Sequence, residues 1–226
     1  TISMGEIDKM IKDSLHAVGL GYDTLKIKIG DDPQKDVERV KAIHSALDKN
    51  IKLRLDANQG WTAKESVNLL HTLEKENIIA EFIEQPVRAD DIEGLRYIKE
   101  RVQTPLLADE SIFSVKDARK LLEMQAIDYV NIKLAKTAGI TQALELADLS
   151  KAFGVKCMIG CMLEGPISVA AGVHVASAKA DVITMLDLDA VSLLASHPVE
   201  TSIIFNESEI ILSDSVGLGV SLDTSF

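Results

Sequence analysis

The chain alternates between short apolar runs and longer segments with a helical repeat. The short runs are rich in Ile, Leu and Val and lack a strict polar alternation, which is typical of parallel strands that helices cover on their faces. We expect strands at Thr24–Gly30, Ile51–Asn58, Ala80–Val87, Pro105–Ser111, Tyr129–Leu134, Lys156–Leu163 and Val182–Asp189.

The segments between these runs carry apolar residues three and four positions apart, the period of a helix with one buried face. Pro33, Thr62 and Ser114 suit the first turn of a helix, and Gly154 stands just past a helix end, where glycine is common. We expect helices at Met4–Gly19, Pro33–Lys49, Thr62–Asn77, Asp90–Arg101, Ser114–Gln125, Gly139–Phe153 and Pro166–Lys179.

This alternation predicts the α/β class. Thr1–Ser3 looks like the clipped end of one more strand, and a closed TIM-type (β/α) barrel is then the economical fold. A doubly wound open sheet is the alternative, but no GxGxxG motif follows an early strand. We expect the barrel over residues 1–196. Residues 197–226 have short β-like pieces and a GLG turn, so we expect a C-terminal tail outside the barrel.

Composition narrows the class further. The 226 residues are 46% hydrophobic, enough for a sizeable core, and no apolar run approaches the ~20 residues of a membrane span. A net charge of −11 argues against nucleic acid or a membrane as partner. Cys157 and Cys161 would lie about 13 Å apart on one strand, too far for a disulfide, so we expect free thiols in a cytoplasmic protein.

Charged residues recur near the ends of successive strands, about 25 residues apart, the length of a strand, a helix and their loops. The carboxyl ends of barrel strands form one face, where active sites lie. An isolated aspartate at a strand end usually stabilises the turn that follows the strand. Several in consecutive units are harder to explain that way: Asp56, Glu84 and Asp109, with Lys28 before them and Lys133 after them.

Three converging carboxylates repel one another, and a hard divalent cation would offset that repulsion. Lys26 and Lys28 are two residues apart on one strand and would face the same side. Lys28 is then a candidate base, and Lys133 would stand on the opposite side of the carboxylates. A lysine on each face of one carbon suits reversible proton transfer.

The last expected strand carries Asp187 and Asp189, again two residues apart. They are either a turn or helix-capping pair, or a receptor for an ammonium group, which two carboxylates would hold by charge-assisted hydrogen bonds.

The chain resembles the enolase superfamily in its muconate lactonising subgroup. The motifs that carry the resemblance span the expected barrel and are KIK (Lys26–Lys28), DANQGW (Asp56–Trp61), IEQP (Ile83–Pro86), ADES (Ala108–Ser111) and NIKLAKTAG (Asn131–Gly139). Within the subgroup, DLDA (Asp187–Ala190) is similar to the DxD signature of dipeptide epimerases of the L-Ala-D/L-Glu type.

The resemblance, rather than the residues alone, implies the detailed roles. It implies one Mg²⁺ held by the three carboxylates, and a Lys28–Lys133 acid/base pair that moves the α-proton of a dipeptide through an ene-diolate. It implies that the DxD aspartates bind the dipeptide's ammonium group and that Lys26 contacts its carboxylate. It also implies that Thr1, Cys161 and Leu163 face the substrate.

The resemblance also implies a partner within the protein. Family members carry an N-terminal capping domain, which we expect to be missing here, and the 197–226 tail would pack towards it. The alternatives are o-succinylbenzoate synthase, muconate cycloisomerase or N-acylamino acid racemase on the same scaffold. A non-catalytic metal-binding barrel is an alternative of another class. The expected partner is a small-molecule dipeptide, and a homo-oligomer is compatible with the sequence.

Overall fold

The computed structural model describes residues 1–222, which form two compact units. The first comprises Thr1–Ile112 and Asp117–Tyr129. The second comprises Phe113–Lys116 and the chain from Val130 onward. The main boundary therefore falls inside one strand, between Tyr129 and Val130. The last four residues of the expected tail, 223–226, lie outside the described residues.

The first unit contains four parallel strands in chain order: β1 (Thr24–Lys28), β2 (Lys52–Asp56), β3 (Phe82–Glu84) and β4 (Leu106–Ala108). Lys28 pairs in register with Asp56, and Asp56 with Glu84. The last residues of three adjacent strands therefore form one row.

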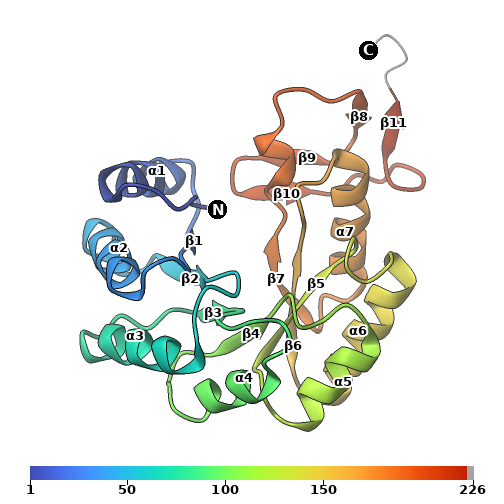
Figure 1. Ribbon diagram of the computed structural model, residues 1–226. Coiled ribbons are helices and arrows are strands. Elements are labelled where there is room, and N and C mark those ends of the chain that lie inside the picture. Colours follow the sequence, from blue (N-terminus) through green and yellow to red (C-terminus); the bar gives the residue numbers. More distant parts are fainter. Residues whose placement is uncertain (223–226) are drawn as a thin grey trace. The chain divides into compact units, whose positions relative to one another are not determined.

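The helices of this unit alternate with its strands along the chain, beginning with a helix before β1. They are α1 (Ile7–Gly19), α2 (Pro33–Ala46), α3 (Ala63–Lys75), α4 (Ile92–Lys99) and most of α5 (Val115–Glu123). Helices α1 to α4 pack each against the next, as Figure 1 shows along β1–β4. Local signals set their starts. Asp32 caps α2 ahead of Pro33, and Thr62 with Glu65 forms a capping box on α3.

Residues before the first helix also pair with the sheet. The Ile2 backbone N–H donates to the Lys26 carbonyl at 2.7 Å, and the Lys28 N–H donates to the Ile2 carbonyl at 3.0 Å. Ile2 and Ile27 thereby form a parallel bridge, and both side chains are buried. The chain at Ile2 thus lies beside β1 in the direction of a parallel strand.

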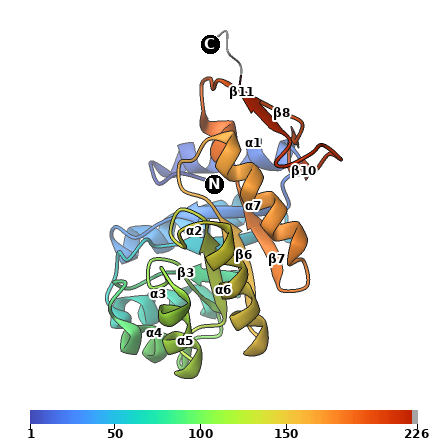
Figure 2. The same ribbon diagram turned by 90° about the vertical axis from the view of Figure 1, so that its right-hand side faces the viewer.

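The second unit holds β5 (Tyr129–Lys133) from Val130 onward, β6 (Lys156–Gly160) and β7 (Ile183–Asp187), with α6 (Ile140–Ala152) and α7 (Pro166–Ala178) between them. Strands β6 and β7 are parallel, and the strand order again follows the chain. Helices α6 and α7 lie side by side against β6 (Figure 2). Helix α7 is apolar on nearly every face and largely buried.

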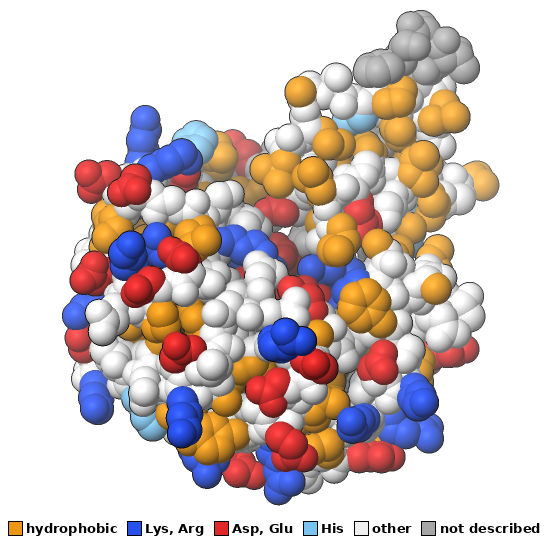
Figure 3. Space-filling model, in the orientation of Figure 1, with side chains coloured by type: hydrophobic (Ala, Val, Ile, Leu, Met, Phe, Trp, Pro, Cys, Tyr) orange, Lys and Arg blue, Asp and Glu red, His pale blue; other side chains and the backbone are white. Residues whose placement is uncertain are grey.

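Two antiparallel pairs end the described chain. A 3₁₀ turn, η1 (Ala190–Leu193), leads to β8 (Val199–Thr201), β9 (Ile204–Asn206), β10 (Glu209–Ile211) and β11 (Val220–Leu222). Strand β9 pairs with β10, and β8 with β11. Hydrophobic side chains gather on the surface of this segment in Figure 3, and the exposed ones include Ile204, Ile211, Val216 and Leu222.

Every strand and helix expected between Met4 and Asp189 is present, but each is shorter than the sequence pattern predicts, and the expected strand at Thr1–Ser3 forms only an isolated bridge at Ile2. The prediction for β6 was wrong at its end. It stops at Gly160, so Cys161 and Leu163 lie in the following loop and do not alternate along a strand. Similarly, β7 stops at Asp187, and Asp189 lies beyond it. Within residues 1–222 no helix is both long and apolar enough to cross a membrane.

Candidate functional site

The charged residues that the spacing singled out stand at the carboxyl ends of their strands. Lys28, Asp56 and Glu84 are the last residues of β1, β2 and β3, and Asp109 follows β4 by one residue. Because β1, β2 and β3 pair in register, the first three share one edge of the sheet.

A buried ion cluster joins these strand ends. The Lys26 ammonium lies 2.9 Å from Asp56 Oδ2 and 2.8 Å from Glu84 Oε2. Lys26 is 6% exposed and both carboxylates are 0% exposed. Two buried carboxylates this close would repel each other strongly, and the shared ammonium offsets that repulsion. Asp56 and Glu84 therefore point at a common position that suits a cation.

Lys28 joins the same cluster from its solvent side. Its ammonium lies 2.7 Å from Asp56 Oδ2 and donates to Asn58 Oδ1 at 2.8 Å. Its side chain keeps 31% of its surface exposed, whereas Lys26 keeps 6%. The two lysines therefore share one carboxylate but differ in access, and Lys28 is the one that a small molecule can reach.

The donor chemistry fits a hard divalent cation. Asp56 and Glu84 each already bring an oxygen within 3 Å of one ammonium, so both reach a single positive charge, and Mg²⁺ prefers carboxylate oxygens. Among residues 1–222, no group of three or more His, Cys, Asp or Glu side chains is drawn together into a metal site as they stand. A common cation ligand set with Asp109 remains a prediction.

The backbone that carries Asp109 is fixed by Gln85. This side chain is fully buried, and its Oε1 accepts hydrogen bonds from the backbone N–H groups of Asp109 at 3.0 Å and Ser111 at 3.1 Å. Its Nε2 donates to the Val87 carbonyl at 3.0 Å and to Ser111 Oγ at 2.8 Å. One amide thus connects the end of β3 to the loop after β4.

The loops after β1 and β2 touch through glycine. A Cβ on Gly60 would lie 2.1 Å from the Gly30 carbonyl oxygen, and a Cβ on Gly30 would lie 2.1 Å from the Ala57 oxygen. Gly30 also has φ +114, which favours glycine. The DANQGW motif needs its glycine so that these two loops can approach beside Lys28.

The second unit places the other predicted lysine. Lys133 is the last residue of β5 and is 7% exposed, and Asn131, two residues earlier, is 0% exposed. A Cβ on Gly160 would lie 2.7 Å from Asn131 Oδ1 and 3.2 Å from Lys133 Cε. Gly160 thus leaves room at the end of β6 for both side chains.

The DxD pair lies at the end of β7. Asp187 and Asp189 are both partly exposed, and Asp189 occupies the N-cap position of η1 without a side-chain capping bond. The structure therefore does not support the capping interpretation for Asp189. Cys161 is near this segment, because its thiol donates to the Asp187 carbonyl at 3.4 Å.

The other predicted substrate contacts differ in how far their side chains are exposed. Thr1 is exposed and Leu163 is 77% exposed, whereas Cys161 is partly buried. Cys157 and Cys161 are free thiols, and burial raises the pKa of each to about 11. Both thiols are therefore protonated near neutral pH and suit contact roles better than nucleophilic ones.

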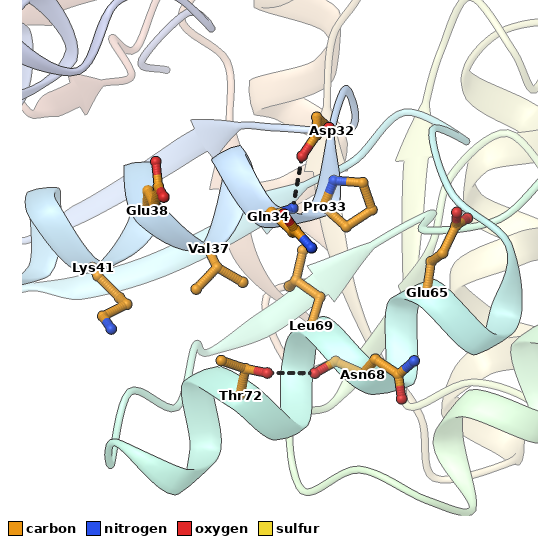
Figure 4. Close-up of a pocket in the computed structure, with 10 residues that line it drawn as sticks. All are labelled: Asp32, Pro33, Gln34, Val37, Glu38, Lys41, Glu65, Asn68, Leu69 and Thr72. Atoms are coloured by element: carbon orange, nitrogen blue, oxygen red, sulfur yellow. Dashed lines mark hydrogen bonds between the residues drawn. The ribbon is translucent and has the colours of Figure 1, made fainter.

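A separate groove of about 780 Å³ lies between α2 and α3. Figure 4 shows its lining, which comes from the surfaces of the two helices and includes Val37, Lys41 and Leu69. None of the predicted site residues lines this groove. The groove and the ion cluster are therefore distinct features of the first unit.

The sequence pattern missed the uncharged side chains of the site. Asn58 and Gln85 lie inside quoted motifs, but only their charged neighbours stood out by spacing. A signal exists in the backbone: Asn58 and Gln85 have φ +41 and +36, which non-glycine residues rarely adopt. Conformations of this kind concentrate at functional sites, but they appear only once the structure is known.

Comparison with known proteins defines the fold family. The family described as "Enolase C-terminal domain-like" matches residues 9–226. The chain belongs to this family, and its fold class is the TIM-type (β/α) barrel domain of the enolase superfamily.

The similar proteins include epimerases and racemases. The chain is 46% identical over 220 residues to the L-Ala-D/L-Glu epimerase of Clostridium acetobutylicum, covering 97% of this chain and 61% of that protein. A dipeptide epimerase of Enterococcus faecalis, complexed with Mg and L-Leu-L-Tyr, has a TM-score of 0.92 at 41% identity, covering 97% and 62%. The N-succinyl Arg/Lys racemase of Bacillus cereus has a TM-score of 0.94 at 30% identity, covering 99% and 60%. The chain thus spans about 60% of these relatives.

Proposed function

We propose that the protein containing this chain is an isomerase that epimerises dipeptides of the L-Ala-D/L-Glu type. The observation that carries the proposal is the buried cluster of Lys26, Asp56 and Glu84 with Lys28 at its exposed side. The similarity to dipeptide epimerases over 97% of the chain supports the same reading.

The chain's own residues supply proton transfer. Lys28 removes or returns the substrate's α-proton on one face, and Lys133 does so on the other. The Lys28 side chain is partly exposed, and its hydrogen bond to Asn58 holds its nitrogen at the accessible side of the cluster. Lys26 lies deeper and places positive charge behind the substrate carboxylate, where negative charge grows as the proton leaves.

We propose Asp56, Glu84 and Asp109 as ligands of one Mg²⁺ ion. When bound, the ion would supply positive charge beside the substrate carboxylate and lower the cost of forming the carbanion. Gln85 holds the Asp109 backbone that this ligand set requires.

The substrate's free amine is the second part of the proposal. Asp187 and Asp189 are partly exposed and two residues apart at the end of β7. A pair of carboxylates can hold an ammonium group by charge-assisted hydrogen bonds. Leu163 and Thr1 are exposed and remain proposed substrate contacts, as does Cys161.

Both cysteines are free thiols, which fits our proposal of a cytoplasmic location.

Deuterium incorporation tests the proposal directly. The full-length protein with Mg²⁺ is incubated in D₂O with L-Ala-L-Glu or L-Ala-D-Glu, and mass spectrometry follows the mass of the Glu residue. We expect one deuterium per molecule and conversion of each epimer into the other. The absence of exchange from a panel of dipeptides would remove the epimerase proposal.

A racemase of N-acylated amino acids is the second candidate, because the Bacillus cereus relative acts on N-succinyl Arg/Lys by its name. Such a substrate has no free amine. Asp187→Asn combined with Asp189→Asn should lower activity on dipeptides by about 10²-fold or more, the cost of two lost charge contacts. Unchanged dipeptide kinetics in this double variant would show that the two aspartates do not bind the amine, and would remove the feature that favours dipeptides over N-acylated amino acids.

A further inference from the structure

A hydrogen-bond relay connects the proposed base to a residue outside the predicted site. Lys28 Nζ donates to Asn58 Oδ1 at 2.8 Å, and Asn58 Nδ2 donates to Glu110 Oε1 at 3.0 Å. The Asn58 amide therefore lies between a cation on its oxygen side and a carboxylate on its nitrogen side. This order of partners fixes which way the amide points, because the reverse orientation would set like partners against each other.

The backbone of Asn58 is held at the same time. Its N–H donates to Asp56 Oδ1 at 3.0 Å, and its φ of +41 lies in the left-handed region. Asparagine tolerates this region better than most residues do. The side chain thus leaves the strand end at a set angle and reaches both Lys28 and Glu110.

Glu110 has a buried polar atom whose placement the fold alone does not explain. Its Oε2 atom is buried and has no hydrogen-bond partner among residues 1–222. A buried acceptor without a partner is destabilising, because it has lost its hydrogen bonds to water. Glu110 follows Asp109 and comes from the loop after β4, whereas Asn58 follows β2. The contact therefore spans two strand ends across the intervening β3.

We infer that Glu110 and Asn58 are positioning residues for Lys28, and that they hold its side-chain nitrogen beside the α-carbon of the substrate. This role rests on the proposed function. Lys28 has Asp56 as its other partner, which pulls its ammonium toward the buried cluster. The Asn58 oxygen provides the second fixed point, so that the ammonium has one defined position. A displacement near 1 Å at such a position can cost about 10²-fold in rate.

The role predicts an effect on one face of the substrate only. Lys28 removes the α-proton of one epimer, and Lys133 removes that of the other. Exchange that returns deuterium to the same epimer needs only one of the two lysines. The Lys133→Ala variant identifies the epimer that Lys28 serves, since only that epimer should still exchange its α-proton.

The test compares Glu110→Met with Glu110→Gln in the full-length protein with Mg²⁺ in D₂O. Glu110→Met should slow exchange into the epimer that Lys28 serves by about tenfold, as is typical when a supporting hydrogen bond is lost. Exchange into the other epimer should stay within about twofold. Glu110→Gln keeps an acceptor for Asn58 and should recover part of the loss. The control is Glu93→Met on the exposed first turn of α4, which should change neither rate.

The possible results distinguish the positioning role of Glu110 from the proposed epimerase function. Equal slowing of both epimers by Glu110→Met would overturn the positioning role and leave the epimerase intact. No exchange in the wild type would overturn the proposed function and the role that rests on it. A second measurement needs no substrate: an NMR spectrum of the side-chain amides, with Asn58 assigned by its loss in Asn58→Ser. The Asn58 amide protons should shift upfield in Glu110→Met, and an unchanged shift would count against the relay.

Discussion

Charged residues at the strand ends differ in how deeply they are buried and in whether a substrate can reach them. Lys26 and Lys28 share Asp56, yet one is sealed in the cluster and the other is partly exposed. The difference follows from position, since Lys28 is the last residue of β1 and Lys26 lies two residues inside it. Lys133 is likewise the last residue of its strand, so each proposed acid/base group stands where a strand meets its loop.

Lys133→Ala should slow epimerisation by about 10²-fold or more, because a positioned acid/base group contributes at least that much. The measurement is the interconversion of L-Ala-L-Glu and L-Ala-D-Glu in the full-length protein, followed by chiral chromatography. Lys120→Ala, an exposed lysine on α5, serves as the matched control and should keep the wild-type rate. A wild-type rate in Lys133→Ala would eliminate the two-base mechanism.

Cys157 should make stability depend on alkaline pH. Burial raises the pKa of its thiol from 9.0 to about 11, so the unfolded thiol ionises first. Its stabilising contribution is therefore complete below pH 9 and is lost as the pH rises towards 11. The loss amounts to about 2–3 kcal/mol at most, at 1.36 kcal/mol per pKa unit.

Urea unfolding at several values between pH 8 and pH 10.5 measures this loss. Since lysines and tyrosines also titrate in this range, the informative quantity is the difference between the wild type and Cys157→Ala. The free energy of unfolding should fall more steeply with pH in the wild type. Parallel slopes for the two proteins would contradict a raised thiol pKa.

At the scale of elements, the sequence predicted the alternation of strands and helices well, because parallel strands and amphipathic helices carry strong local patterns. It overestimated β6, since apolar residues continue through Met162 and Leu163 after pairing has stopped at Gly160. No local pattern marks that point. The hydrogen bonds of Gln85 to Asp109 and Ser111 are equally invisible, because they join residues from two different loops.

The packing of two loops through Gly60 gives a prediction at this scale. A methyl group at residue 60 would lie 2.1 Å from the Gly30 carbonyl oxygen, so Gly60→Ala must move the loop beside Lys28. We expect a loss of about 1–3 kcal/mol in the free energy of unfolding, the usual cost of overpacking. Gly19→Ala is the control, because its Cβ would meet nothing within 4 Å at the end of α1. Equal stabilities of the two variants in urea would refute the close packing.

At the scale of the whole molecule, the predicted site residues are divided between the two compact units. The carboxylates and the Lys26–Lys28 pair belong to the first unit, and Lys133 with the DxD aspartates belongs to the second. The regular spacing along the chain singled out Lys28, Asp56, Glu84, Asp109 and Lys133, because each unit of a strand, a helix and their loops has a similar length. The spacing does not predict the hydrogen bonds through Asn58 and Glu110, because they depend on side-chain contacts between strand ends.

Mg²⁺ should stabilise the folded protein through the carboxylates of the first unit. A ligand that binds only the folded state at one hundred times its dissociation constant adds about 2.7 kcal/mol to the free energy of unfolding. For a chain of this size that corresponds to a rise of several degrees in Tm. Differential scanning calorimetry in Mg²⁺, compared with EDTA at equal ionic strength, measures the shift and removes general screening by salt.

The variant Asp56→Asn should lose this shift, because Asp56 is fully buried and shares its cation position with Glu84. Asp128→Asn is the matched control. Asp128 accepts from the Leu106 N–H at 2.9 Å, at the opposite end of β4 from Asp109, so its loss changes stability but not the Mg²⁺ shift. If Asp56→Asn responds to Mg²⁺ as the wild type does, the cation binds elsewhere, and the row of strand-end carboxylates is held by its lysines alone.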